Sequence, residues 1–197
     1  EGLVRATKFD PPEGAESLPG ERVRASLAES LDRLGVETVP LLYLHDPSRF
    51  ALRDLLAPGG PVEALAQLKA DGIVEAIGIA DGDVAYSRAL LDEAPFDVVL
   101  NHNRYTLLAR SAVPLIEHAR RNDIAFINAA PFGSGIRGRG PDVHRRYAYV
   151  EAGDRLVETA RRLQEACEAR GVPLAAAGLH VSTRDARVAL AVVGIPS

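Results

Sequence analysis

A chain of 197 residues with 47% hydrophobic residues is long enough to bury a core of its own, and its composition is typical of one globular domain. The formal net charge of −4, without a basic run interleaved with aromatic residues, excludes an ordinary nucleic-acid surface. The apolar stretches have only the length of strands and no signal-peptide pattern is present, which excludes a membrane partner. The one cysteine, Cys167, excludes an internal disulfide. These features predict a cytoplasmic protein.

Short apolar runs alternate along the chain with amphipathic helical patterns, which indicates βα units that build a parallel sheet. The six predicted strands lie near Leu3–Thr7, Val39–Leu44, Val74–Ile79, Phe96–Leu100, Ile124–Ala129 and Val188–Gly194. The clearest predicted helix has an apolar stripe of Val23, Leu27, Leu31 and Leu34 and ends at Gly35. Other helices are predicted over Pro61–Ala70, over Asp154–Arg170, which has a cap at its start, and from Val172 to about Ser182.

Six parallel units are compatible with a doubly wound sheet or with part of an eight-stranded barrel. A dinucleotide-binding doubly wound sheet predicts a G-x-G-x-x-G turn after an early strand, whereas the glycines of 133–138 come late and with another spacing. We therefore expect an α/β fold of the (β/α)8 TIM-barrel class, with about six of its units in one domain spanning 1–197. The long irregular segment Pro131–Gly153 is expected to serve function.

Unusual polar residues follow the predicted strands at their C-terminal ends, which is the active-site face of a TIM barrel. They are Lys8, His45 with Asp46, Asp81, Asn101 with His102, and Asn128 before Pro131–Ser134. The alternative is that these residues are polar only because strand ends meet solvent. Taken alone, His45 is as compatible with a histidine bonded within the core as with a catalytic one. The set favours function, as does Lys8, because a lysine can tune the pKa of a neighbouring acid whereas the more abundant arginines cannot. No metal-ligand spacing or serine-nucleophile motif is present.

Several segments together resemble the aldo/keto reductase family over essentially the whole chain. They are Ala6-Thr7-Lys8, Ser30–Val36 followed by Leu41–His45, Gly72–Ile79, Arg104–Leu108 and Phe132–Ile136. The form Arg-Tyr-Thr-Leu-Leu, with His45-Asp46-Pro47 and Tyr147-Ala148-Tyr149, is most similar to the branch of fucose, galactose and other aldose 1-dehydrogenases, with a pyridoxal dehydrogenase nearby.

The resemblance implies an oxidoreductase that transfers a hydride between a nicotinamide cofactor, NADP or NAD, and an aldose, aldehyde or hemiacetal. In this family a tyrosine is the general acid/base, a lysine and an aspartate depress its pKa, and a histidine orients the substrate oxygen. Lys8 matches the lysine and His45 the histidine. Tyr105 matches the tyrosine that stacks on the nicotinamide, and the loop over the pyrophosphate matches Pro131, Phe132, Gly133, Ser134 and Gly135.

The sequence departs from the family where the nicotinamide carboxamide is held. The family's Ser-Asn pair is replaced by Ala80-Asp81-Gly82, and its glutamine three residues before the stacking tyrosine is His102. Asp81 and His102 are therefore the expected cofactor contacts at these positions.

The family's catalytic aspartate and tyrosine lie on two βα units that we expect upstream of Glu1, and its adenosine-phosphate segment is expected after Ser197. Tyr43 is not expected to replace the tyrosine if Leu42 and Leu44 face the opposite side of the strand. Activity is then expected of a longer protein or an assembly, including a homo-oligomer, rather than of 1–197 alone. The alternatives are a non-catalytic nicotinamide-binding or scaffold protein of the same fold, and a different barrel enzyme with chance similarity.

Overall fold

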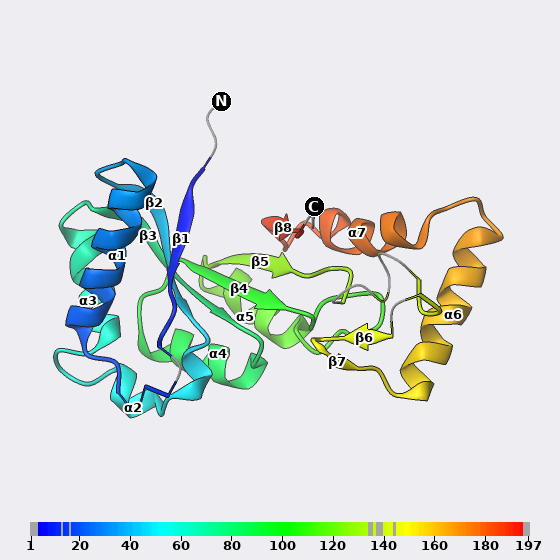
Figure 1. The fold of residues 1–197 in the computed structure, drawn as a ribbon, viewed down its shortest axis with the longest axis horizontal. Coiled ribbons are helices and arrows are strands. Elements are labelled where there is room, and N and C mark those ends of the chain that lie inside the picture. The colour runs from blue at the N-terminus through cyan, green and yellow to red at the C-terminus, as the bar shows by residue number, and fades with distance from the viewer. Residues whose placement is uncertain are drawn as a thin grey trace. The chain divides into compact units, whose positions relative to one another are not determined.

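The computed structural model describes residues 4–12, 14, 15, 17–133, 136, 140–143 and 145–194. The chain forms two compact units, Glu1–Leu100 and Asn101–Ser197. In both units, strands alternate with helices along the chain, as the sequence pattern predicts (Figure 1). None of the helices in the described ranges has the length and the apolar character that crossing a bilayer requires.

The described residues of the first unit form parallel strands with their helices. Its elements are β1 (Ala6–Phe9), α1 (Gly20–Leu34), β2 (Val39–His45), a short 3-10 helix η1 (Pro47–Arg49), α2 (Leu52–Leu55), α3 (Pro61–Ala70), β3 (Val74–Asp81), α4 (Val84–Glu93) and the part of β4 (Val98–His102) up to Leu100. Strand β2 pairs in parallel with β1 on one side and with β3 on the other. The predicted strands are confirmed, and β1 lies further along the chain than expected because Ala6–Phe9 pair with Leu41–Leu44.

Helix α1 covers the strands of the first unit with the apolar stripe that the sequence predicts. Val23 and Leu27 are buried, whereas Leu34 at the last turn is 47% exposed. The helix ends at Gly35, whose φ of 63° lies in the left-handed region that a glycine adopts without strain. Helices α1 and α3 pack side by side along β1–β3 (Figure 1).

A close contact between β2 and β3 fixes the interior of the first unit. Tyr43 and Gly78 are opposite each other in the parallel register. A Cβ atom on Gly78 would lie 2.9 Å from the Tyr43 ring and 3.0 Å from the Val98 carbonyl oxygen. The ring of Tyr43 therefore occupies the space that a side chain at position 78 would need.

Replacing Gly78 by alanine is expected to lower the free energy of unfolding by about 1–3 kcal/mol, because a methyl group must displace a buried ring or backbone. Urea denaturation measures this change. The matched control is Gly194→Ala, where an added Cβ meets no atom within 4 Å. Equal stability of the two variants would contradict the packing role of Gly78.

The second unit contains the remaining strands and three helices. Its elements are the end of β4 from Asn101, α5 (Val113–Arg121), β5 (Ala125–Ala129), β6 (Arg146–Tyr147), β7 (Val150–Glu151), α6 (Asp154–Glu168), α7 (Leu174–Arg184) and β8 (Leu190–Val192). Strand β5 pairs in parallel with β8. The strands predicted in 96–100, 124–129 and 188–194 are thus confirmed, with β8 shorter than expected.

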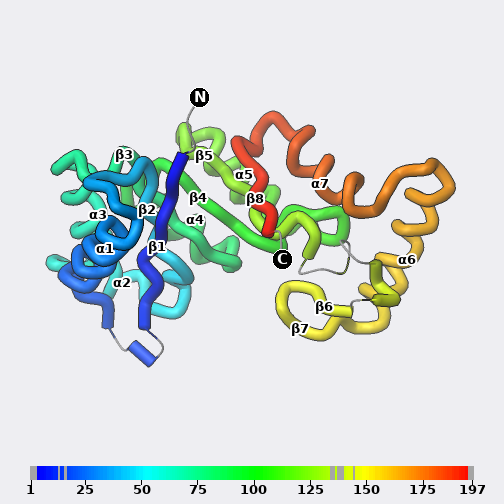
Figure 2. The backbone as a smooth tube through the Cα atoms, turned by 45° about the horizontal axis from the view of Figure 1, so that its top comes forward, coloured from blue at the N-terminus to red at the C-terminus, as the bar shows by residue number. Residues whose placement is uncertain are grey.

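The irregular segment predicted at Pro131–Gly153 contains a small antiparallel hairpin, β6–β7, that the sequence did not indicate. This hairpin lies beside α6 (Figure 2). A separate buried cluster forms there from Ile136, Ala152, Val157 and Ala160, with Leu108, Tyr147 and Leu156 packed against it. The segment is therefore anchored by a small core that it shares with α6.

The boundaries of α6 and α7 differ slightly from the prediction. The residue that caps α6 is Gly153 without a side-chain hydrogen bond, so a cap by Asp154 is wrong. Asp154 instead lies in the first turn, where its charge favours the helix dipole, and its carboxylate accepts a 2.7 Å hydrogen bond from Arg145. Cys167, on α6, is half-buried.

Candidate functional site

The structure brings Lys8 and His45 together in the first unit. Lys8 is opposite Tyr43 in the β1–β2 register, two residues before His45. Its Nζ atom lies 3.3 Å from Nε2 and 3.4 Å from Nδ1 of His45. The two residues predicted to be catalytic therefore form one cluster at the C-terminal ends of neighbouring parallel strands.

A third member of this cluster, Asp10, was missed by the sequence analysis. The carboxylate accepts a 2.9 Å hydrogen bond from Nδ1 of His45 and lies 3.3 Å from Nζ of Lys8. Burial raises the pKa of Asp10, but hydrogen bonds and charges of His45 and Lys8 outweigh this effect and leave the pKa below its usual value. Asp10 is therefore ionised at neutral pH. The signal that points to it is its place two residues after Lys8, directly after the end of β1, because side chains two apart along an extended chain point to the same side.

The turn after β2 and the helix η1 that follows it also contact the cluster. Asp46 has a φ of 44°, and its backbone N–H donates a 2.9 Å hydrogen bond to the Ala80 carbonyl oxygen. The chain then enters η1, from which the Arg49 guanidinium reaches the Asp10 carboxylate at 3.5 Å and the Pro11 carbonyl oxygen at 3.3 Å. The guanidinium of Arg49, on η1, therefore adds a second positive charge beside the Asp10 carboxylate.

Tyr43 lies on the same side of β2 as His45, because residues two apart along a strand share a face. The alternation that orients Leu42 and Leu44 gives Tyr43 and His45 a common direction, so the side of the strand does not by itself exclude Tyr43 as the family's tyrosine. Burial raises the pKa of Tyr43 to about 12. That shift is opposite to the one a general acid needs near neutral pH, so Tyr43 remains a packing residue against Gly78.

Asp81, predicted as a cofactor contact, lies at the end of β3 and is 2% exposed. Its carboxylate accepts hydrogen bonds from the Ser48 backbone N–H at 2.8 Å, the Ser48 hydroxyl at 3.0 Å and the Asp83 backbone N–H at 2.7 Å. These bonds tie the turn after β2 to the end of β3. In this structure the side chain thus holds the loops beside the cluster.

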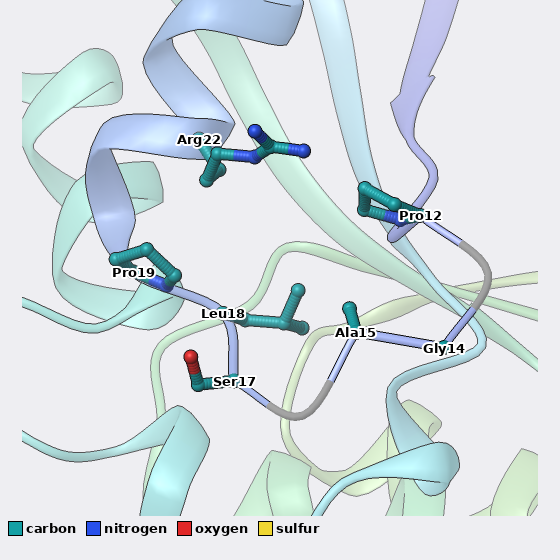
Figure 3. A pocket seen from close by; sticks show the side chains of 7 residues that line it. All are labelled: Pro12, Gly14, Ala15, Ser17, Leu18, Pro19 and Arg22. Carbon is teal, nitrogen blue, oxygen red and sulfur yellow. The ribbon is translucent and has the colours of Figure 1, made fainter.

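A shallow pocket lies in the segment between β1 and α1. Figure 3 shows its lining, with the Arg22 side chain extending across it towards Pro12. The remaining lining residues are Gly14, Ala15, Ser17, Leu18 and Pro19. Lys8, Asp10 and His45 are not among the residues that line it.

In the second unit, His102 ends β4 and is half-buried. The Asn103 side-chain amide nitrogen lies 3.0 Å from Nδ1 of His102. An amide nitrogen donates, so Nδ1 accepts and the ring hydrogen is placed on Nε2. The ring of Tyr149 from the turn of the hairpin packs edge-on against His102, with centroids 5.8 Å apart.

Tyr105 is buried at 7% exposure and takes part in a charged network. The hydroxyl donates a 2.5 Å hydrogen bond to Asp185, and the Arg110 guanidinium lies 4.8 Å from the ring centroid. Asp185 in turn accepts three hydrogen bonds from Arg187, two from the guanidinium and one from the backbone N–H, and Arg187 also binds Glu117. Burial and the bond to Asp185 raise the pKa of Tyr105. No sequence pattern predicts this network, because Asp185 is 80 residues away from Tyr105.

The Arg187 guanidinium, by its hydrogen bonds, holds the pKa of Asp185 well below its usual range. A carboxylate with a depressed folded-state pKa stabilises the fold above its unfolded pKa, and this contribution is lost as pH falls from about 4 towards the folded pKa. Asp185→Asn is therefore expected to lower the free energy of unfolding at neutral pH by about 2 kcal/mol. The difference from the wild type should shrink below pH 4 in urea denaturation.

Asp142→Asn is the control for this experiment, because Asp142 pairs with Arg161 in a solvent-exposed ion pair. It should change stability much less than Asp185→Asn at neutral pH. A difference between Asp185→Asn and the wild type that stays constant from neutral to acidic pH would contradict the linkage.

The segment predicted to cover the pyrophosphate begins with a turn after β5. Pro131 and Gly133 are buried, and Gly133 has a φ of 58° with its N–H bonded to the Ala130 carbonyl oxygen at 2.9 Å. The ring of Phe132 lies against Gly178 of α7, where an added Cβ would meet it at 3.6 Å. Ser134 and Gly135, which belong to the same prediction, lie outside the described residues.

Comparisons with known proteins agree with the family resemblance that the sequence predicts. The sequence pattern of the Aldo/keto reductase family matches residues 1–197. A D-threo-aldose 1-dehydrogenase of a Pseudomonas species is 37% identical over 175 residues, which are 87% of this chain and 52% of the relative. A pyridoxal 4-dehydrogenase of Microbacterium luteolum is 30% identical over 183 residues, or 89% of this chain and 54% of the relative. The chain thus spans about half the length of these relatives.

The fold is similar to that of solved aldo-keto reductases. The holo form of one from Bacillus halodurans superposes with a TM-score of 0.76 at 20% identity and covers 98% of this chain and 61% of that protein. At this identity the likeness concerns the fold, and it agrees with the prediction of part of a (β/α)8 barrel.

Proposed function

Because this chain belongs to the aldo/keto reductase family, we propose that it provides substrate-binding and cofactor-binding residues of an NAD(P)-dependent oxidoreductase. The proposed reaction moves a hydride between nicotinamide and the carbon of an aldose, aldehyde or hemiacetal. Two relatives of the chain are named D-threo-aldose 1-dehydrogenase and pyridoxal 4-dehydrogenase, which supports a sugar or aldehyde substrate. NADP and NAD are both retained as cofactors.

The observation that carries this proposal is the cluster of Lys8, Asp10 and His45. An ammonium group and an imidazole 3.3 Å apart present two hydrogen-bonding groups to one substrate oxygen. The ammonium group stabilises the negative charge that develops on that oxygen when its carbon gains or loses a hydride, and the imidazole holds the oxygen in place by a hydrogen bond. In this proposal His45 orients the oxygen, and Lys8 supplies positive charge beside it.

The second unit has residues that fit a nicotinamide cofactor. The buried Gly133 has a positive φ, which allows a close backbone approach to a phosphate without strain. The ring of Tyr105 and the imidazole of His102 are proposed to contact the nicotinamide, and Pro131 and Phe132 the pyrophosphate. When bound, the cofactor donates or accepts the hydride.

A non-catalytic nicotinamide-binding or scaffold protein of the same fold is the second candidate. It is favoured by Asp81, whose carboxylate occupies the position of the family's Ser-Asn pair and is bonded to the chain's own Ser48 and Asp83. A carboxylate without a donor hydrogen changes the way in which a carboxamide is held at that position.

The test uses the intact purified protein with NAD and with NADP. Nicotinamide absorbance is followed with a panel of aldoses, aliphatic aldehydes and pyridoxal, and cofactor binding is measured separately by calorimetry. Turnover of any of these substrates is the expected result. Binding of the cofactor without turnover would support the scaffold protein, and absence of both would contradict both candidates.

A further inference from the structure

We infer that Asp10 is a positioning residue, whose carboxylate holds Lys8 in place and selects the tautomer of His45. The inference rests on the proposed function, because the two side chains that it positions are the ones proposed to meet the substrate oxygen. Asp10 is distinct from the family's catalytic aspartate, which the sequence analysis expects on an earlier βα unit.

The two carboxylate oxygens of Asp10 bind different partners. Oδ1 accepts from Nδ1 of His45 at 2.9 Å, and Oδ2 faces Nζ of Lys8 at 3.3 Å. Nζ of Lys8 is nearly equidistant from the two ring nitrogens of His45, at 3.3 and 3.4 Å, and both contacts are longer than the one with Asp10. The shortest and most specific contact of the imidazole is therefore the one with Asp10.

This contact determines where the ring hydrogen of neutral His45 lies. A carboxylate only accepts hydrogen bonds, so Nδ1 must carry the hydrogen and Nε2 keeps its lone pair. A substrate hydroxyl can then donate to Nε2. Without Asp10 the hydrogen is free to move to Nε2, and the ring would present a donor where the substrate hydroxyl needs an acceptor.

The surroundings of Asp10 keep it ionised without making it essential to the fold. The charged and titratable groups that face it are Lys8 on β1, His45 at the end of β2 and Arg49 on η1, and Asp46 lies 3.8 Å from the His45 ring. The side chains of Lys8 and Asp10 are 49% and 51% exposed. An exposed ion pair is screened by water and contributes little to stability, so its removal should leave the fold intact.

The experiment replaces Asp10 by asparagine in the intact protein. With 15N-labelled histidine, the two ring nitrogens of His45 are followed by NMR at a pH where the ring is neutral, and His45→Ala identifies the signals. The wild type is expected to show the Nδ1–H tautomer and Asp10→Asn a mixture or the Nε2–H tautomer. In kinetics, kcat should fall by about 10- to 100-fold, as displacement of a reacting group does, with an unchanged Kd for the cofactor.

The matched control is Asp46→Asn, which removes a carboxylate 3.8 Å from the same ring nitrogen but outside hydrogen-bond distance. It should leave the tautomer unchanged and reduce kcat by less than about threefold, as loss of an exposed charge does. Asp10→Glu should recover part of the tautomer preference. Thermal unfolding verifies that each variant is folded, and Asp10→Ser is the second variant if Asp10→Asn is not.

The NMR measurement and the kinetic measurement separate this inference from the proposed function. An unchanged tautomer in folded Asp10→Asn or Asp10→Ser overturns the inference, whether or not kcat falls. A changed tautomer with unaltered kcat in an active protein also overturns it. If the wild type turns over no substrate, the proposed function fails, and the NMR result still decides whether Asp10 positions His45.

Discussion

Replacing Lys8 by methionine in the intact protein is expected to lower kcat/KM by about 1,000-fold, which is the range of general acid–base and charge effects at an active site. Methionine keeps most of the length of the side chain but has no charge and no donor hydrogen. The loss should appear mainly in kcat, because Lys8 is proposed to act on charge that develops during the reaction. Steady-state kinetics with the best aldose or aldehyde measure both parameters.

The other lysine of the chain provides the control. Lys69 on α3 pairs with Asp97 at 2.5 Å and belongs to no part of the Lys8 cluster. Lys69→Met should alter stability through the loss of this ion pair while kcat/KM stays close to that of the wild type. Loss of activity to the same degree in both variants would show that Lys8 acts through folding and not through the reaction.

His45→Ala is expected to reduce kcat/KM by about 100-fold, because the substrate oxygen loses a group that orients it. The loss of kcat/KM should be smaller than in Lys8→Met, because the positively charged ammonium group of Lys8 still stabilises the oxygen. The expected signature is a fall in kcat together with a rise in KM for the sugar or aldehyde. The Kd of the cofactor, measured by calorimetry, should not change.

His180→Ala is the control for this prediction, because His180 is an exposed residue of α7. It should retain the kinetic constants of the wild type. If His45→Ala is folded and turns over substrate as fast as the wild type, the orienting role of His45 is wrong.

The strands could be predicted from the sequence because each is a compact apolar run between turn residues. In β2, Val39, Leu42 and Leu44 are all buried, as expected for a parallel strand covered on both faces. The boundaries were less accurate, since the shift of β1 depends on its register with β2. The hairpin β6–β7 was missed because its strands have only two residues each, too few for any periodicity.

The proximity of Lys8 and His45 could also be predicted, because the C-terminal ends of neighbouring parallel strands meet at one edge. Asp10 was missed because β1 was predicted to end at Thr7, whereas it extends to Phe9 and Asp10 is the residue that directly follows it, although its distance of two residues from Lys8 carried the signal. The bond between Tyr105 and Asp185 has no such signal. It joins residues far apart in the chain, and only the folded second unit brings them together.

The small core shared by the hairpin and α6 separates the stability of this segment from that of the parallel strands. Exchanges within 131–153 must preserve the turn Pro131–Gly133, which is proposed to meet the cofactor, and the residues of this small core, Ile136, Tyr147 and Ala152. The rest of the segment can therefore tolerate substitutions and insertions with little loss of stability, as the variable loops of other folds do. Chimeras that exchange this segment between related dehydrogenases are accordingly expected to fold, and they offer a direct route to altered substrate preference.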